Sequence, residues 1–144
     1  MATVLGILLF LVFLFLSGIH FYWGAGGVWG KDSSVPSKES GEIVLKPKAI
    51  DCFIVALALL AFALFVLVKV DLLVLNLPEW VRHNLLWMIA SLFVLRALGD
   101  FKYVGFFKKI KNTRFAVLDT KYFSPLCLLI ALLCFVIQMF SRSF

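Results

Sequence analysis

Residues 3–23 read TVLGILLFLVFLFLSGIHFYW and contain no charged side chain. An α-helix needs about 20 consecutive apolar residues to cross the hydrocarbon core of a bilayer. The stretch lacks the basic start and the A-x-A cleavage site of a secretory signal peptide, so we expect an uncleaved anchor. This run therefore predicts the first helix of a membrane-embedded chain.

Three further apolar runs predict three more transmembrane helices, at roughly residues 50–69, 81–98 and 122–141. The second contains CFIVALALLAFALFVLV at 52–68, and the fourth contains CLLIALLCFVIQMF at 127–140. The third carries Arg96 near its end, where the guanidinium must reach the interface or find a partner. The predicted fold is all-α, a polytopic four-helix transmembrane bundle, with residues 1–144 forming one integral membrane domain.

The composition excludes an ordinary water-soluble domain. The chain is 63% hydrophobic and 15% charged and has 16 phenylalanines, whereas a soluble domain is roughly half apolar and about a quarter charged. The net charge of +6 would suggest nucleic acid for a soluble protein. In a membrane protein it is better explained by basic cytoplasmic loops, so we expect no nucleic-acid partner.

The basic residues predict the orientation. Four spans place the long loops 24–48 and 99–121 on one side, with ten lysines and arginines, against three on the side of the termini. The positive-inside rule then puts both loops in the cytoplasm and both termini outside. The expected location is the plasma membrane, where the basic loops would meet anionic lipid headgroups.

The same topology brings several polar residues to the loop-bearing end of the helices. This predicted polar cluster consists of His20, Trp23, Asp51, Arg96, Asp100, Asp119 and Tyr122. Ionisable groups at a hydrocarbon boundary are costly unless they are paired. Arg96 and Asp100 could pair along one helix, but that order is the weaker one. We therefore expect a carboxylate from another helix, Asp51 or Asp119, to engage Arg96 as well, with His20 beside them.

No motif assigns a reaction. The chain has no H-x-x-x-H, H-E-x-x-H or C-x-x-C, so we expect no metal, no cofactor and no catalytic residue. The three cysteines are too few and too scattered for a disulfide framework. All three belong to two stripes of mostly small residues, Cys127–Ala131–Cys134–Gln138 on the fourth helix and Cys52–Ala56–Ala63 on the second. Such stripes let membrane helices approach closely, so they are predicted to be packing surfaces.

Four segments resemble a small bacterial membrane-protein family, domain of unknown function 3995. They are SGIHFYWGAGGVWG at 17–30, VPSK at 35–38, LRALGDFKYVGFFK at 95–108 and LDTKYFSPLCLLIALL at 118–133. Three motifs carry the resemblance: H-x-x-W-x-x-G-G-x-W, R-x-x-G-D and D-T-x-x-x-S-P-L. The resemblance implies a four-helix bacterial membrane protein and brings no activity with it. Its motif residues here would be His20, Trp23, Gly27, Trp29, Arg96, Asp100, Asp119 and Pro125.

Three functional hypotheses follow. The first is a non-enzymatic membrane protein whose polar cluster binds a small ligand, a lipid headgroup or a partner. The second is a membrane-embedded enzyme acting on a lipid or quinone, with His20 as acid/base and Arg96 holding an anionic group. The third is an accessory subunit that packs against a larger membrane complex through the small-residue stripes. Self-association and the identity of any membrane partner are left open.

Overall fold

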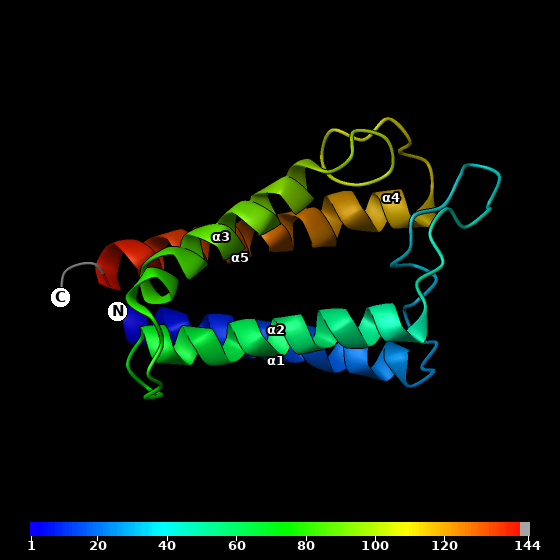
Figure 1. Ribbon diagram of the computed structural model, residues 1–144. Helices are drawn as coiled ribbons and strands as arrows, with labels where there is room; N and C mark the ends of the chain where they lie inside the picture. Colours follow the sequence, from blue (N-terminus) through cyan, green and yellow to red (C-terminus); the bar gives the residue numbers. More distant parts are fainter. Residues whose placement is uncertain (142–144) are drawn as a thin grey trace.

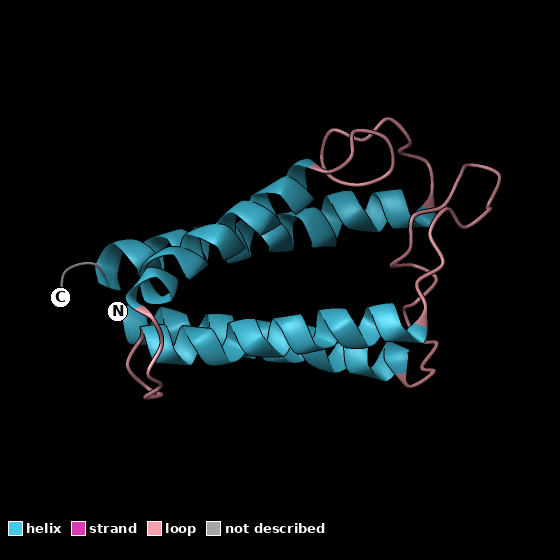
Figure 2. Ribbon diagram, viewed as in Figure 1, coloured by secondary structure: helices cyan, strands magenta, loops and turns pink. Residues whose placement is uncertain are grey.

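The computed structural model describes residues 1–141, and that part of the chain is helical apart from its connections (Figures 1 and 2). The helices are α1 (Ala2–Gly24), α2 (Ala49–Lys69), α3 (Glu79–Leu98), the short α4 (Arg114–Leu118), a π-helical turn η1 (Asp119–Phe123) and α5 (Ser124–Ser141). Four helical segments in residues 1–141 are long and apolar enough to cross a membrane, with α4, η1 and α5 forming the fourth. The predicted fold class is confirmed.

The helices form two antiparallel pairs, α1 with α2 and α3 with α5, and α1 also contacts α5. Figure 1 shows the pairs closest near the chain ends and diverging toward the opposite end. The start of α1 and the end of α5 lie together at one end, and the connections 25–48 and 99–113 lie at the other. This arrangement positions polar residues from distant parts of the sequence at the loop-bearing end.

The core between the helices is mainly apolar. Phe13 is fully buried, and its ring lies 5.8 Å from Phe62 of α2 and 5.7 Å from Phe93 of α3, so this ring joins the two pairs. Ser17 donates a 2.7 Å hydrogen bond to the carbonyl of Ala56 and ties α1 to α2. The outward faces of the same helices expose many leucines, valines and phenylalanines, which suits lipid as the surrounding solvent.

The two small-residue stripes lie inside the chain. Cys52, Ala56 and Ala63 are buried on α2, and Cys127, Ala131, Cys134 and Gln138 are buried on α5. The prediction that they are packing surfaces is confirmed, because small side chains at these positions let neighbouring helices approach.

The fourth helical segment begins earlier than expected, at Arg114 rather than 122. Thr113 caps it, with Oγ1 accepting a 3.0 Å hydrogen bond from the amide of Ala116. The π turn then lies directly before Pro125, which has no N–H to donate and would crowd the preceding turn of a regular helix. The prediction of a loop over 99–121 is therefore wrong for its last part, because residues 114–121 are helical.

Candidate functional site

Asp119 is the centre of the loop-bearing end. Its side chain is fully buried and accepts hydrogen bonds at both carboxylate oxygens. Nη2 of Arg96, on α3, lies 3.0 Å from Oδ1. On the other oxygen, Oδ2, the amide of Gly105 donates at 2.7 Å and Nζ of Lys108 at 3.2 Å. The carboxylate therefore joins α3, the 99–113 connection and the start of the last membrane helix. We call Arg96, Gly105, Lys108, Asp119 and Thr120 the Asp119 cluster.

Lys108 is an internal part of this cluster. Its side chain is 1% exposed. Besides Asp119, its ammonium donates to the carbonyl of Gly105 at 2.8 Å and to Oγ1 of Thr120 at 2.5 Å. An ammonium has three N–H donors. All three are used within the chain, which makes Lys108 a structural cation rather than a ligand-binding one.

Arg96 is different, because part of its guanidinium remains unused. One carboxylate faces two cations, so the Asp119 cluster carries one net positive charge. Nη1 of Arg96 is shielded and has no hydrogen-bond partner within residues 1–141, while the side chain as a whole is 34% exposed. The hydroxyl of Ser124, one π turn after Asp119, is also buried without a partner in the part of the chain that the structure describes. Unpaired buried donors are costly, so an anionic group would find both charge and hydrogen bonds here.

Two glycines shape the connection that presents Lys108. Gly99 and Gly105 have φ of +82° and +88°, which L side chains rarely adopt. Each glycine also touches the other's segment: a Cβ on Gly99 would lie 1.7 Å from the carbonyl oxygen of Val104, and one on Gly105 would lie 2.3 Å from that of Leu98. Only glycine lets the two backbone segments pass at this distance.

Asp100 holds the turn between these glycines. Its Oδ1 accepts hydrogen bonds from the amides of Lys102, Tyr103 and Val104 at 3.0, 2.8 and 3.0 Å. Partial burial by itself raises the pKa of this carboxyl, but the three amide donors outweigh it, so the pKa lies below its ordinary value. Asp100 is used by the backbone of its own loop, and its carboxylate makes no described ion pair with Arg96.

The remaining members of the predicted polar cluster lie elsewhere at the same end. Nδ1 of His20 lies 2.7 Å from the carbonyl of Leu16, and its ring packs edge-on against Trp23. Asp51 accepts from the amide of Lys48 at 2.8 Å and caps α2. Tyr122 is exposed beneath the ammonium of Lys121. Among residues 1–141, the described contacts join Arg96 to Asp119 but not to Asp51 or His20.

The tryptophans fold the exit from α1. Nε1 of Trp23 donates to the carbonyl of Trp29 at 2.8 Å, and the amide of Trp29 donates to the Tyr22 hydroxyl at 3.3 Å. Gly27 lies under the Tyr22 ring, where a Cβ would meet ring carbons at 2.4 Å. Trp23, Gly27 and Trp29 of the H-x-x-W-x-x-G-G-x-W motif therefore stabilise the turn that follows α1.

The sequence-based selection missed Gly105, Lys108, Thr120 and Ser124. Thr120 and Ser124 occupy fixed letters of the D-T-x-x-x-S-P-L motif, which was the available signal for them. Lys108 carried no such signal, because it is one of four lysines in FKYVGFFKKIK at 101–111 and its burial depends on a partner distant in sequence.

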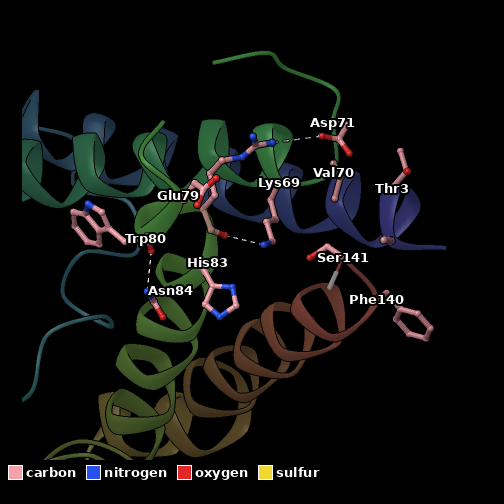
Figure 3. Close-up of a pocket in the computed structure, with 12 residues that line it drawn as sticks. Thr3, Lys69, Val70, Asp71, Glu79, Trp80, His83, Asn84, Phe140 and Ser141 are labelled. Atoms are coloured by element: carbon pink, nitrogen blue, oxygen red, sulfur yellow. Dashed lines mark hydrogen bonds and ion pairs between the residues drawn. The ribbon is translucent and has the colours of Figure 1, made fainter. Parts of the chain in front are cut away.

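A concavity lies at the end opposite the Asp119 cluster, where α1 begins and α5 ends (Figure 3). It has a volume of about 830 Å³ and is lined by residues from all four membrane helices, among them Thr3, Lys69, Arg82, His83 and Ser141. Its charges are mixed: Nζ of Lys69 donates to the carbonyl of Arg82, and Arg82 lies 3.8 Å from Asp71. In residues 1–141, no three His, Cys, Asp or Glu side chains gather as a metal site.

The fold and the Asp119 cluster together define the class of protein. The described residues form an all-helical protein with four membrane-compatible helices and a buried ion-pair cluster at one end. The chain belongs to the family described as "Protein of unknown function (DUF3995)", whose family model matches residues 13–134. The matched range includes both motifs that meet at Asp119, so the expected family is confirmed. No curated protein and no solved structure matches the chain.

Proposed function

We propose that this protein is a non-enzymatic, multi-pass protein of the bacterial plasma membrane that binds a phosphate-bearing ligand at the Asp119 cluster. One observation carries the proposal: Asp119 neutralises only one of its two cations, and Nη1 of Arg96 has no hydrogen-bond partner among residues 1–141. A cluster with excess positive charge and an unused guanidinium donor favours an anion with several acceptor oxygens.

Phosphate is the favoured chemistry because of where the cluster lies. Arg96 is in the last turn of α3, at the boundary between an apolar helix and a basic connection. Lipid headgroup phosphates lie at this depth of a bilayer, and basic side chains beside a span attract anionic lipids. A phosphate of a soluble metabolite would offer the same oxygens, so the experiment must separate the two sources.

The enzymatic alternative receives less support. It requires His20 and Arg96 to act on one substrate, yet His20 is engaged with Leu16 and Trp23 on α1, and Arg96 with Asp119. The accessory-subunit alternative relied on the small-residue stripes. Those stripes are buried within the chain and are not available to a second protein.

The orientation is part of the proposal. Because ten basic residues lie on the loop side and three on the terminal side, we expect the Asp119 cluster to face the cytoplasm. A C-terminal alkaline phosphatase fusion should be active in the periplasm, and a C-terminal green fluorescent protein fusion should be dark. A bright fluorescent fusion would place the cluster on the outer side and overturn this part.

The direct test is native mass spectrometry of the protein released from detergent micelles, with Arg96→Gln beside the unmodified chain. The proposal predicts a retained phospholipid or phosphorylated compound on the unmodified protein, and its loss from Arg96→Gln. Arg114→Gln is the matched control, since Arg114 is an exposed arginine at the same end, and it should keep the adduct. The adduct mass separates a lipid from a soluble phosphate. A bare unmodified protein after addition of either class would contradict the proposal.

A further inference from the structure

The 99–113 connection has an inverted distribution of polarity. Phe101 and Phe107 are 59% and 61% exposed, whereas Lys108, the next residue, is 2% exposed. In a loop surrounded by water the phenylalanines would turn inward and the lysine outward. Here the lysine is used to anchor the loop on Asp119, and the rings are presented on the outside.

The two exposed rings form one apolar feature. Their centroids lie 6.3 Å apart with the planes inclined at 41°. Phe106, between them in the chain, is 37% exposed. Three phenylalanines of one short loop are therefore exposed, and the rings of Phe101 and Phe107 lie side by side.

The loop holds these rings on a fixed framework. The amide of Phe106 donates to the carbonyl of Ala97 at 2.8 Å, and the amides of Lys109 and Ile110 donate to the carbonyl of Lys102 at 3.2 and 3.0 Å. Asp100 fixes the turn from within, as described above. The exposure of the rings is thus imposed by backbone hydrogen bonds and is not the result of a loosely placed segment.

Backbone strain points the same way. Phe101 has a φ of +63°, a left-handed conformation that is a genuine outlier for a bulky side chain. Such conformations persist where the surroundings impose them, and they gather at functional positions. The Asp100 carboxylate, which accepts from the amides of residues 102–104, imposes it here, and the result is an exposed ring.

The charges around the rings select the partner. Lys102, Lys109 and Lys111 are exposed on the same connection. The two acids of residues 99–121, Asp100 and Asp119, are both engaged by the chain itself. The connection also begins where α3 leaves the apolar segment. Exposed aromatic rings among lysines at the edge of a membrane span suit an anionic lipid surface.

We propose that the 99–113 connection docks into the leaflet beside it, with Phe101, Phe106 and Phe107 at the boundary between acyl chains and headgroups. Lys102, Lys109 and Lys111 then contact the anionic headgroups. This surface shares no residue with the Asp119 cluster and does not depend on a ligand at Arg96. The surface proposal and the proposed function can therefore fail separately.

Fluorescence quenching of a site-specific bimane label tests this in the full chain. The label is attached to Phe107→Cys or, if that variant does not fold, to Phe101→Cys; the native cysteines are buried, and the unmodified chain reports their background labelling. Ser40→Cys is the control, an exposed position on the other connection at the same end. The protein is reconstituted into vesicles of phosphatidylcholine and phosphatidylglycerol that carry a nitroxide near the start of the acyl chain.

Lipid-borne nitroxide should quench the label at 107 at least about twofold more than the label at 40, and aqueous iodide should show the reverse order. Removing phosphatidylglycerol, or replacing the three lysines by glutamine, should reduce the lipid quenching at 107. Equal iodide quenching at the two positions would overturn the proposal. So would protection of the 107 label from both quenchers, which would indicate contact with a second copy. Lipid quenching that is unchanged without phosphatidylglycerol would overturn the anionic partner.

Discussion

The two long connections lie at the same end of the bundle, and both are basic and contain glycine, yet they are built differently. The 25–48 connection is held by short-range contacts, such as the Ser34 hydroxyl on the Gly30 carbonyl and the exposed pair of Lys38 with Glu42 at 2.7 Å. The 99–113 connection is joined to α3 and to the last membrane helix through one buried carboxylate, Asp119.

This difference shows what decides whether a charged loop becomes part of the core. In the 25–48 connection the ion pair is exposed, and water competes for both partners. Lys108 of the 99–113 connection and Asp119 of η1 are both removed from water, so each depends on the other. Equivalent substitutions in the two connections should therefore have unequal effects.

The largest difference is expected for glycines. Gly105→Ala places a Cβ 2.3 Å from a backbone carbonyl and also strains φ at +88°, so we expect a loss of at least about 4 kcal/mol of stability or failure to accumulate. Gly41→Ala is the matched control, since Gly41 has φ of +86° but open space around it. It should cost about 1 kcal/mol. Thermal unfolding in detergent measures both, and equal shifts would contradict the close approach at Gly105.

Removal of the buried carboxylate should cause the next largest loss of stability. Asp119→Asn leaves Lys108 and Arg96 without their counter-charge and should lower the free energy of unfolding by about 3–5 kcal/mol. In the other connection, Glu42→Gln removes the partner of Lys38 and should leave the unfolding midpoint nearly unchanged, because that pair is exposed and water competes for both partners. A comparable effect from both variants would mean that Asp119 is not the structural centre of its end.

Arg96 should have an intermediate effect. Arg96→Ala removes one hydrogen bond to a carboxylate but leaves Lys108 in place, and the side chain is 34% exposed, so we expect a loss of about 1.5–3 kcal/mol. Arg96→Lys keeps the charge and loses the planar guanidinium, and it should fall between alanine and the unmodified chain. An unchanged unfolding midpoint for Arg96→Ala would instead describe an arginine that merely extends to the interface.

The smallest effect concerns pH. The folded pKa of Asp100 is lowered by its three amide donors. The ionised Asp100 carboxylate therefore stabilises the folded state at pH values above the unfolded pKa of about 3.9. This stabilisation is lost as the pH falls through the folded pKa. Hydrogen exchange at the amides of 102–104 should accelerate in acid relative to the 25–48 connection. Asp100→Ala should show this acceleration already at neutral pH, and protection that is independent of pH and of this residue would refute the role.

The sequence was sufficient for the parts of the structure that depend on local pattern. Apolar run length predicted four membrane helices, and the low charge of those runs predicted which segments lie between them. The prediction that a carboxylate from another helix engages Arg96 is confirmed for Asp119, because a guanidinium at the end of an apolar helix needs a counter-charge.

The parts that depend on tertiary contact could not be predicted in this way. Asp51 and Asp119 were equal candidates, since each begins an apolar run, and only the pairing of α3 with α5 separates them. His20 was expected beside Arg96 from its depth alone, but depth does not specify which helix neighbours which. Lys108 has the same local environment in sequence as Lys109, yet one is buried and the other exposed.

Asp119 and Lys108 form one buried unit that fixes the 99–113 connection. A double-mutant cycle of Asp119→Asn and Lys108→Met, scored by the free energy of unfolding in detergent micelles, tests it directly. For residues in contact within one network the coupling energy should be about 1–3 kcal/mol, so the double variant should be much less destabilised than the sum of the single variants. Strict additivity of the two substitutions would show that Asp119 and Lys108 do not form one unit.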